Sequence, residues 1–214
     1  EEKYEKRLHC RISVPNPNVS VYEFNYDEWV PPPLREQFGG FDFGFDKPLI
    51  IIHNKYNQEW GRSPINFLDT PTLERIFEIL CKNFTVIYSR PGDDVIVGDH
   101  SGVYSLQGEN EVCEKYGVIK STNLFKKFSN KFRNFNHFQL CLHSQCDRFV
   151  SVQGGSSYLA SYFGGTNLVF AVRGSEVENG SFGGYFRKLG GCDVRSFSTY
   201  DNLVSAIKSI FIKG

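Results

Sequence analysis

Short apolar runs and amphipathic stretches alternate along most of the chain. LIIIH (49–53) and TVIYS (85–89) place apolar residues at consecutive positions, which is typical of strands buried on both faces. Between them, TPTLERIFEILCKNF (70–84) repeats apolar residues at helical spacing, with Thr70 as a candidate N-cap and Pro71 in the first turn. The pattern therefore predicts a strand, a helix and a second strand, in this order.

The last third of the chain repeats this alternation with short connections. The expected elements there are a strand RFVSVQ (148–153), a helix SSYLASYFGG (156–165), a strand NLVFAV (167–172), a strand DVRSFS (193–198) and a closing amphipathic helix TYDNLVSAIKSIFIKG (199–214). A strand, a helix and a strand joined by short loops indicate parallel strands with a crossover helix. We therefore expect residues 48–214 to form one Rossmann-like α/β domain, with a parallel sheet of five or six strands and helices on both faces.

The segment between these two regions has a less regular pattern. DVIVGD (94–99) and GVYSL (102–106) are candidate short strands, and residues 121–146 are expected to form one or two helices. Phenylalanines recur on one face of these helices, and basic residues fall mostly elsewhere: Phe125, Phe128, Phe132 and Phe135 against Lys126, Lys127, Lys131 and Arg133. A solvated basic face over a core-facing aromatic stripe is the favoured interpretation, and a site for a phosphate or a polyanion is the alternative.

Residues 1–47 follow a different pattern. ISVPNPNVSVYEF (12–24) alternates as one or two strands interrupted by prolines would, and WVPPPLREQFGGFDFGFDKP (29–48) is typical of a loop. This portion is too short to form a second α/β domain. We therefore expect a short, irregular N-terminal portion over 1–47, either an arm or the remnant of an acceptor-side domain, followed by the Rossmann-like domain over 48–214.

Composition and charge limit the classes of partner. The 214 residues carry 24 basic and 24 acidic side chains, so the formal net charge is zero, which argues against a general nucleic-acid binder and against an anionic membrane surface as the main partner. No run of 18 apolar residues occurs, and the first ten residues lack the apolar core of a signal peptide. The six cysteines are scattered without a CxxC pair, so a cytoplasmic location is expected.

One loop has the features of a phosphate site. Ligands of an open parallel sheet bind at the carboxyl ends of its strands, and there the chain runs from a strand through Gln153, Gly154, Gly155, Ser156 and Ser157 into a helix. The glycines let the backbone approach a ligand, the serines offer hydroxyls, and a helix N-terminus presents N–H groups and a partial positive charge. We predict a seat for a diphosphate. Because the stretch matches neither a Walker loop nor the GxGxxG fingerprint, an ordinary turn is the alternative.

A second loop with unusual chemistry, HNKYNQEW, follows the first strand of the domain. It contains His53, Lys55, Tyr56, Glu59 and Trp60. Lys55 is a candidate for neutralising a phosphate, and His53 or Glu59 is a candidate general base. The two aromatic residues are candidates for stacking on a sugar or a base. A plain polar loop is the alternative.

Two further residues are candidate donor-binding groups. Glu176 lies in RGSEVENG after the strand NLVFAV, where its carboxylate would accept hydrogen bonds from ribose hydroxyls; Glu178 or a solvated loop is the alternative. Arg90 follows the second strand and would pair with a phosphate, although an arginine there is as often a surface residue.

Metal ligands are sparse in the sequence. Cys141, His143 and Cys146 of CLHSQC do not share one face of a helix, and no D-x-D motif occurs. We therefore expect neither a metal nor a resident cofactor. A serine hydrolase is also disfavoured, because no G-x-S-x-G elbow occurs.

Four segments together resemble the nucleotide-sugar-binding half of GT-B-type glycosyltransferases: PLIIIHNKYNQEW, FTVIYSRP, CDRFVSVQGGSSYLASYFGGTNLVFAVRGSE and YDNLVSAIKSIF. The closest likeness is to the compact enzymes of large DNA viruses of algae, the chlorella-virus type, which build capsid glycans. The resemblance covers roughly residues 48–214. It implies that a donor diphosphate sits on the helix after Gly154–Ser157, that Glu176 holds the ribose, and that the reaction needs no metal.

The resemblance implies a specific reaction and location. A sugar, such as the pentose xylose, would pass with inversion from a nucleotide-diphosphate donor to a glycan hydroxyl, in the host cytoplasm if the enzyme is viral. His53 or Glu59 would act as the base, while Lys55, Arg90 and the stretch Gln153–Ser157 would stabilise the departing diphosphate.

The chain departs from this family in its short N-terminal portion, because a full GT-B enzyme has two Rossmann-like domains. A non-catalytic nucleotide- or glycan-binding module is therefore the alternative function. A Rossmann-type methyltransferase or reductase is disfavoured, because no glycine-rich loop follows the first strand of the domain. The sequence leaves the oligomeric state open.

Overall fold

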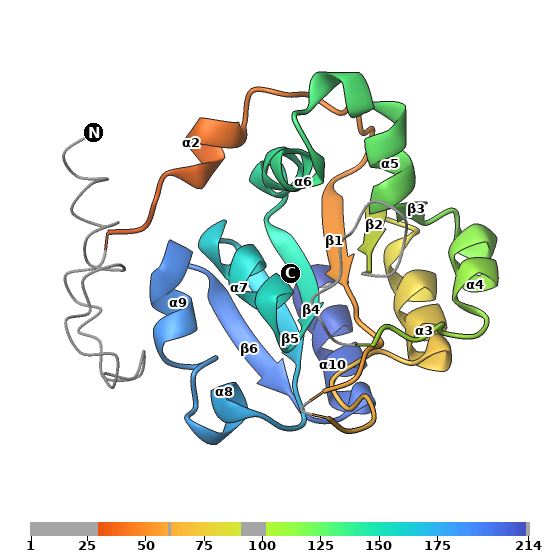
Figure 1. Ribbon diagram of the computed structural model, residues 1–214, viewed down its shortest axis with the longest axis vertical. Coiled ribbons are helices and arrows are strands. Elements are labelled where there is room, and N and C mark those ends of the chain that lie inside the picture. The colour runs from red at the N-terminus through yellow and green to blue at the C-terminus, as the bar shows by residue number, and fades with distance from the viewer. Residues whose placement is uncertain (1–29, 60, 91–101, 213–214) are drawn as a thin grey trace.

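The computed structural model describes residues 30–59, 61–90 and 102–212. Within them, six parallel strands form one sheet in the order β3-β2-β1-β4-β5-β6 (Figure 1). The strands are β1 (Leu49–His53), β2 (Thr85–Ser89), β3 (Ile119–Lys120), β4 (Arg148–Val152), β5 (Thr166–Phe170) and β6 (Asp193–Phe197). The predicted Rossmann-like α/β architecture is confirmed, and the described residues hold six strands where five or six were expected.

The strand order creates a switch point between β1 and β4. β1 pairs with β2 on one side and with β4 on the other. The chain therefore proceeds outward from β1 to β3, returns to β4, and proceeds outward again to β6. Open sheets of this order bind ligands at the carboxyl ends of the two strands at such a point. These ends, at His53 and Val152, point toward the lower edge of Figure 1.

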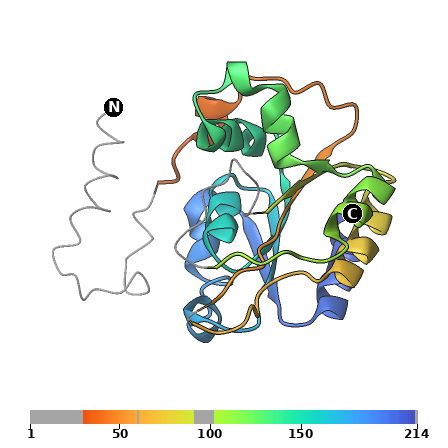
Figure 2. The same ribbon diagram turned by 45° about the vertical axis from the view of Figure 1, so that its right-hand side comes forward.

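One face of the sheet is covered by α3 (Thr70–Leu80), α4 (Glu109–Tyr116) and α10 (Tyr200–Ile207). Their apolar side chains pack with the residues of β1 and β4 that point to this face, such as Ile50, Ile52 and Val150. Figure 2 shows α3 in yellow and α10 in dark blue on the same side of the sheet. A five-residue π-helix, Lys208–Ile212, extends α10.

The opposite face is covered by α5 (Ser121–Lys127), α6 (Phe135–Ser144), α7 (Gly155–Tyr162) and α9 (Tyr185–Gly190). Ile51 and Phe149 belong to the core on the side of α6 and α7, and Val169 and Val194 to the core on the side of α9. Alternate residues of β1, β2, β4 and β5 thus enter cores on opposite faces of the sheet. The predicted helices on both faces are confirmed.

The phenylalanine-rich segment divides into α5, a single 3₁₀ turn over Ser129–Lys131, and α6. The four phenylalanines predicted to share a face all enter the core beneath these helices, Phe132 and Phe135 as buried residues and Phe125 and Phe128 partly buried. The four basic residues of the same segment are exposed: Lys126, Lys127, Lys131 and Arg133. The predicted aromatic core face under a solvated basic face is therefore confirmed.

Some local predictions are wrong. The N-cap of α3 is Asp69, whose carboxylate accepts a hydrogen bond from the backbone N–H of Thr72 (2.9 Å), whereas the hydroxyl of Thr70 donates to the carbonyl of Gln107 (2.6 Å). GVYSL forms no strand, since Val103 makes only an isolated bridge. DVIVGD lies outside the described residues.

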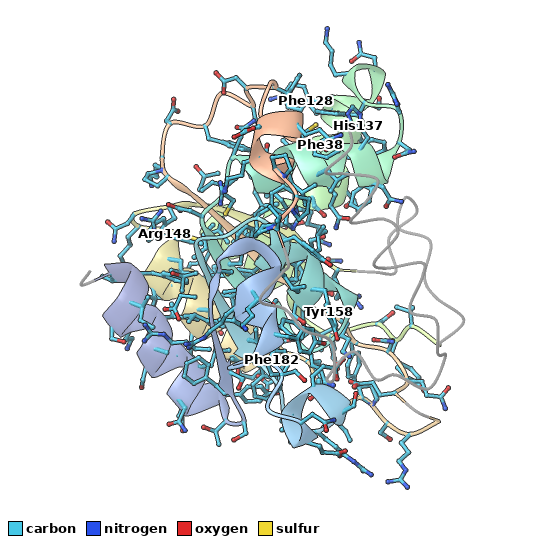
Figure 3. All side chains as sticks on the ribbon, turned by 90° about the vertical axis from the view of Figure 1, so that its left-hand side faces the viewer. Phe38, Phe128, His137, Arg148, Tyr158 and Phe182 are labelled. Carbon is cyan, nitrogen blue, oxygen red and sulfur yellow. The ribbon has the colours of Figure 1, made fainter. Side chains whose placement is uncertain are left out.

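The described part of the N-terminal portion packs on the same core as the sheet. α2 (Leu34–Phe38) lies against α6, and Phe41 and Phe43 are in ring contact with Phe128 and Phe132. The rings of Phe38 and His137 are in edge contact, with centroids 6.1 Å apart, and Figure 3 shows both residues at the upper end of the molecule. The predicted division at residue 47 stays a prediction, but residues 30–47 share a core with the sheet.

Arg35 of α2 joins two helix ends. Its guanidinium donates to the carbonyls of Ser144 (3.0 Å) and Cys146 (2.6 Å) at the end of α6, and to the carbonyl of Phe163 at the end of α7. Helix C-termini carry unpaired carbonyls and a partial negative charge, which a cation stabilises.

The outer strand β6 is covered at one point by a side chain of α9. Arg187 donates both Nε–H and Nη2–H to the carbonyl of Val194, each over 3.2 Å. Along the same strand, Asp193 and Arg195 form an exposed ion pair (2.7 Å).

In the part of the chain that the structure describes, no helix is long and apolar enough to cross a membrane. The five cysteines there are free: Cys81, Cys113, Cys141, Cys146 and Cys192. All but Cys81 are buried, and burial raises the pKa of the Cys146 thiol to about 12. These four cysteines therefore pack as small apolar side chains.

Candidate functional site

The candidate site lies where β1 and β4 end side by side. The loop after β1 carries Lys55 and Glu59, and the loop after β4 leads through Gln153 and Gly154 into α7. The two predicted loops therefore meet at the switch point of the sheet.

Lys55 reaches the N-terminus of α7. Its Nζ lies 3.6 Å from the point that a Cβ on Gly154 would occupy. Gly154 is the N-cap of α7 and has φ +131°, a conformation that residues other than glycine rarely adopt, and no side chain caps the helix there. An ammonium group therefore stands at the N-cap of α7. The backbone N–H of Ser157 already donates to the carbonyl of Gly154 (3.0 Å), whereas the N–H groups of Gly155 and Ser156 precede the first bonds of the helix.

The other predicted residues of this turn take different places. Gly155 is exposed, and nothing described lies within 4 Å of a Cβ added to it. Ser156 is half-buried, whereas Ser157 is buried and its hydroxyl donates to the carbonyl of Gly154 (2.7 Å). Ser157 thus shapes the turn, and Gly155 and Ser156 form its open side.

A buried polar cluster fixes the start of α7 to the sheet. Asn167 of β5 accepts from the hydroxyl of Ser151 (2.8 Å) and donates to the carbonyl of Ser157 and the hydroxyl of Ser161 (3.2 Å each). All four side chains are fully buried. This cluster was not predicted from the sequence, although the polar Ser151 and Asn167 within apolar strands were a signal for it.

Glu59 is the counter-charge of Lys55. Its carboxylate lies 3.2 Å from Lys55 Nζ and accepts hydrogen bonds from the backbone N–H groups of Ile65 (3.2 Å) and Asn66 (2.9 Å). Burial works to raise the pKa of Glu59, but the hydrogen bonds from Asn66 and the charge of Lys55 outweigh it, so the pKa lies below its ordinary value. Glu59 is therefore an ionised carboxylate, and both of its oxygens are bonded to protein groups.

Asn66 links this loop to the loop after β5. Its Nδ2 donates to Glu59 Oε2 (2.7 Å) and to the carbonyl of Arg173 (3.0 Å). Its Oδ1 accepts from the backbone N–H groups of Val172 (2.8 Å) and Arg173 (3.3 Å). Asn66 is fully buried, and sequence reasoning missed it because an asparagine in a polar loop carries no signal of a partner more than 100 residues away.

Gln153 and Glu176, both predicted to bind the donor, are in contact. Gln153 Nε2 donates to Glu176 Oε2, and the backbone N–H of Gln153 donates to the carbonyl of Phe170 (3.0 Å). Gly174 lies against the amide, since a Cβ there would come within 2.0 Å of Gln153 Nε2. Gln153 Oε1 is buried without a hydrogen-bond partner among the described residues.

His53 lies on the side of the sheet that α6 covers, and it is 1% exposed. Its Nε2 is 2.8 Å from Nε2 of His143, whose Nδ1 donates to the carbonyl of Gln139 (2.6 Å). Because Nδ1 of His143 carries the proton in this arrangement, its Nε2 accepts and His53 donates. Burial, followed by the neighbouring His143, holds the pKa of His53 well below its ordinary value.

Arg90 is one strand further from β4 than Lys55. Its Nε donates to the buried carboxylate of Glu109 (2.8 Å), and its Nη1 donates to the carbonyl of Tyr104 (3.0 Å). The structure therefore pairs Arg90 with protein groups and does not bring it to the N-terminus of α7. Trp60 lies outside the described residues, and Tyr56 packs against Phe67 with ring centroids 4.7 Å apart.

Within residues 30–59, 61–90 and 102–212, no group of three or more histidine, cysteine or acidic side chains is arranged to hold a metal ion.

No family model, no curated protein and no solved structure matches this chain.

The geometry of the site therefore carries the functional argument. Lys55 and the start of α7 can bind an anion, and the adjoining Glu176 can accept hydrogen bonds from hydroxyl groups. An anion next to a polyhydroxyl group is the chemistry of a phosphorylated sugar or a nucleotide.

Proposed function

We propose that this chain binds a nucleoside-diphosphate sugar at the carboxyl ends of β1 and β4 and transfers its sugar to a glycan hydroxyl. The proposal takes its ligand class from the site and its reaction from the GT-B-type resemblance of the sequence. The donor sugar would be a hexose or a pentose such as xylose.

One observation carries the proposal: the ammonium of Lys55 stands at the N-terminus of α7. A cation at a helix N-terminus is disfavoured by about 0.3–1 kcal/mol at exposed positions, because both carry positive charge. Among the described residues, the counter-charge paired with Lys55 is Glu59, at 3.2 Å. A diphosphate between Lys55 and the open N–H groups of Gly155 and Ser156 would turn this repulsion into two favourable contacts.

A second contact agrees with a nucleotide. Gln153, which leads into the helix, donates to Glu176 on the loop after β5. A ligand whose diphosphate lies on α7 would therefore extend its ribose toward a half-buried carboxylate. Carboxylates accept hydrogen bonds from paired hydroxyls in this way in other nucleotide-binding folds.

In the proposed reaction, the acceptor hydroxyl attacks the anomeric carbon of the donor, the bond to the diphosphate breaks, and a base takes the hydroxyl proton. Lys55 and the N–H groups of α7 would stabilise the charge that builds on the leaving diphosphate, without a metal. Neither predicted base is free in this arrangement, since His53 is bonded to His143 and Glu59 to Lys55 and Asn66. Glu23 and Asp27 are further acidic residues of the N-terminal portion that we consider as the base, and they lie outside the described residues.

The engagement of both predicted bases favours a second candidate function. A domain that binds a nucleotide or a glycan without turnover needs the same diphosphate seat but no base. The two functions differ in one observable, which is the release of sugar or its transfer from the bound donor.

The experiment is a calorimetric titration with uridine, guanosine, adenosine and cytidine diphosphates, followed by transfer and hydrolysis assays with the corresponding sugars. We expect at least one nucleotide to bind, and Lys55→Ala to weaken it about 10- to 100-fold, the worth of a charge-assisted hydrogen bond. Lys127→Ala, which removes an exposed lysine on α5, is the matched control. Absence of binding by every nucleotide would overturn the proposal, and binding without turnover would select the non-catalytic module.

A further inference from the structure

We infer that Asn66 is a positioning residue that holds the phosphate-binding Lys55 and the ribose-binding loop of Glu176 in one geometry; this inference rests on the proposed function. The side chain of Asn66 is fully buried and is bonded to protein groups. It acts through Glu59 on one side and through the backbone of Val172 and Arg173 on the other.

The contacts form a closed ring around the switch point. Lys55 pairs with Glu59, and Glu59 accepts from Asn66. Asn66 binds the backbone after β5, which continues within three residues to Glu176. Glu176 accepts from Gln153, which precedes Gly154, and Gly154 stands against Lys55. The ring therefore joins the loops after β1, β5 and β4.

The position of Asn66 in the ring requires a carboxamide side chain, because that group both donates and accepts hydrogen bonds. It donates twice and accepts twice, and each of these four bonds goes to a different atom. An aspartate would keep the two acceptor contacts. It would lose both donors and place a second carboxylate against Glu59 and against the carbonyl of Arg173.

The ring predicts how the two halves of the ligand site communicate. If Asn66 is lost, Glu59 loses a donor and the Lys55 ammonium loses its fixed position beside α7. The loop 172–176 also loses the hydrogen bonds that hold Val172 and Arg173 to Asn66. Binding of the diphosphate and of the ribose should then weaken together, although neither Lys55 nor Glu176 has been altered.

A matched control exists in the same loop. Asn54 is also buried, donates to the carbonyl of Leu68 (3.0 Å) and the hydroxyl of Tyr88 (2.9 Å), and accepts from the N–H of Leu68 (2.8 Å). Asn54→Asp therefore makes a similar chemical change at a similar depth, but outside the ring.

The test compares Asn66→Asp and Asn54→Asp, each alone and combined with Lys55→Ala, with inorganic pyrophosphate and the best-binding nucleoside diphosphate as probes. We expect Asn66→Asp to weaken pyrophosphate about 10-fold or more in the otherwise wild-type chain. In the Lys55→Ala chain it should have no further effect on pyrophosphate, but it should still weaken the nucleotide. Asn54→Asp should leave both affinities within about 2-fold.

A measurement on the wild-type chain covers the case in which Asn66→Asp does not fold. Hydrogen exchange at the amides of Val172 and Arg173, which donate to Asn66, should slow when pyrophosphate binds. It should stay unchanged in Lys55→Ala.

The outcomes distinguish a failure of the proposed function from a failure of the role assigned to Asn66. If Lys55→Ala has no effect on either probe, the proposed function fails. If Lys55→Ala weakens binding while Asn66→Asp binds like the wild type, or if the exchange at Val172 and Arg173 does not respond to pyrophosphate, this inference fails and the proposed function stands.

Discussion

The Nε2 atoms of His53 and His143 lie 2.8 Å apart between β1 and α6, and neither side chain is more than 1% exposed. The rings are stacked with centroids 4.9 Å apart, and the His143 ring also lies against Phe149. One hydrogen bond between two neutral imidazoles is satisfied here, whereas a proton added to either ring would be a buried charge beside an unprotonated partner.

This pair should make folding sensitive to moderate acid. Burial lowers the pKa of His143 from 6.5 to about 4. Because the unfolded chain takes up the proton first, stability is full above about pH 6.5 and is lost as the pH falls toward 4, by about 3 kcal/mol for this residue. Urea unfolding between pH 7.5 and 4.5 measures the loss. The loss of stability should be smaller in His143→Gln than in the wild type, whereas the control His137→Gln, on the same helix, should behave like the wild type. An equal loss in the wild type and in both variants would contradict the role of His143.

Arg35 should contribute more stability than its place on a short N-terminal helix suggests. Its guanidinium satisfies carbonyls at the ends of both α6 and α7. We expect Arg35→Ala to lower the free energy of unfolding by about 2–4 kcal/mol, since hydrogen bonds to charged groups are worth about 1.5–3 kcal/mol each and these are partly exposed. Arg75→Ala, which removes an exposed ion pair with Asp201, should cost at most about 1 kcal/mol. Equal costs in denaturant titrations would reject the role of Arg35.

Gly155→Val should block nucleotide binding and leave the fold intact. The position is exposed and has open space for a side chain, but that space is where the proposed diphosphate lies. Gly40→Val, at an equally open loop position away from the site, is the control. Calorimetry with the nucleoside diphosphate and a thermal scan separate binding from folding, and unchanged affinity would reduce this stretch to an ordinary turn.

Gly154→Ala should instead affect both properties. Its φ of +131° costs a residue with a Cβ about 1–3 kcal/mol, and the Cβ would lie 3.6 Å from Lys55 Nζ. We expect a lower unfolding midpoint together with weaker nucleotide binding. A variant that keeps wild-type stability would show that the turn relaxes, and the contact between Gly154 and Lys55 would lose its importance.

Turnover, if the chain is an enzyme, should survive chelation. The proposed stabilising charges are Lys55 and the N–H groups of α7, which EDTA does not remove. The assay is sugar transfer before and after dialysis against EDTA, with addition of manganese as the reverse step. Complete loss that manganese restores would favour a metal-bridged mechanism instead.

The sequence predicts elements whose stability comes from their own pattern. β1 and β2 begin and end as expected, because consecutive apolar residues indicate a strand buried on both faces. α4 was missed because it is largely polar, with few apolar side chains facing the core, and the short helices α8 (Ser175–Glu178) and α9 occupy a glycine-rich segment. Such helices depend on tertiary contacts rather than on periodicity.

The candidate site divides in the same way. The place of Lys55 beside Gly154 follows from strand order, because both residues follow strands that end at one point. The role of Asn66 depends on contacts with Val172 and Arg173, which no local pattern records. The side of the sheet that His53 occupies is likewise hidden, because a fully buried strand shows no alternation of polar and apolar residues.

The two hydrogen bonds from Arg187 to the carbonyl of Val194 affect whether two copies of this protein can pair through the edges of their sheets. An outer strand offers its backbone groups to any other extended chain, and edge-to-edge pairing is a common route to aggregation. At β6 the Val194 carbonyl is already occupied by two N–H groups of Arg187, and the charged pair of Asp193 and Arg195 stands on the same strand. A chain that added here would have to displace a guanidinium and desolvate two charges, so this side of the sheet is protected against growth by strand addition.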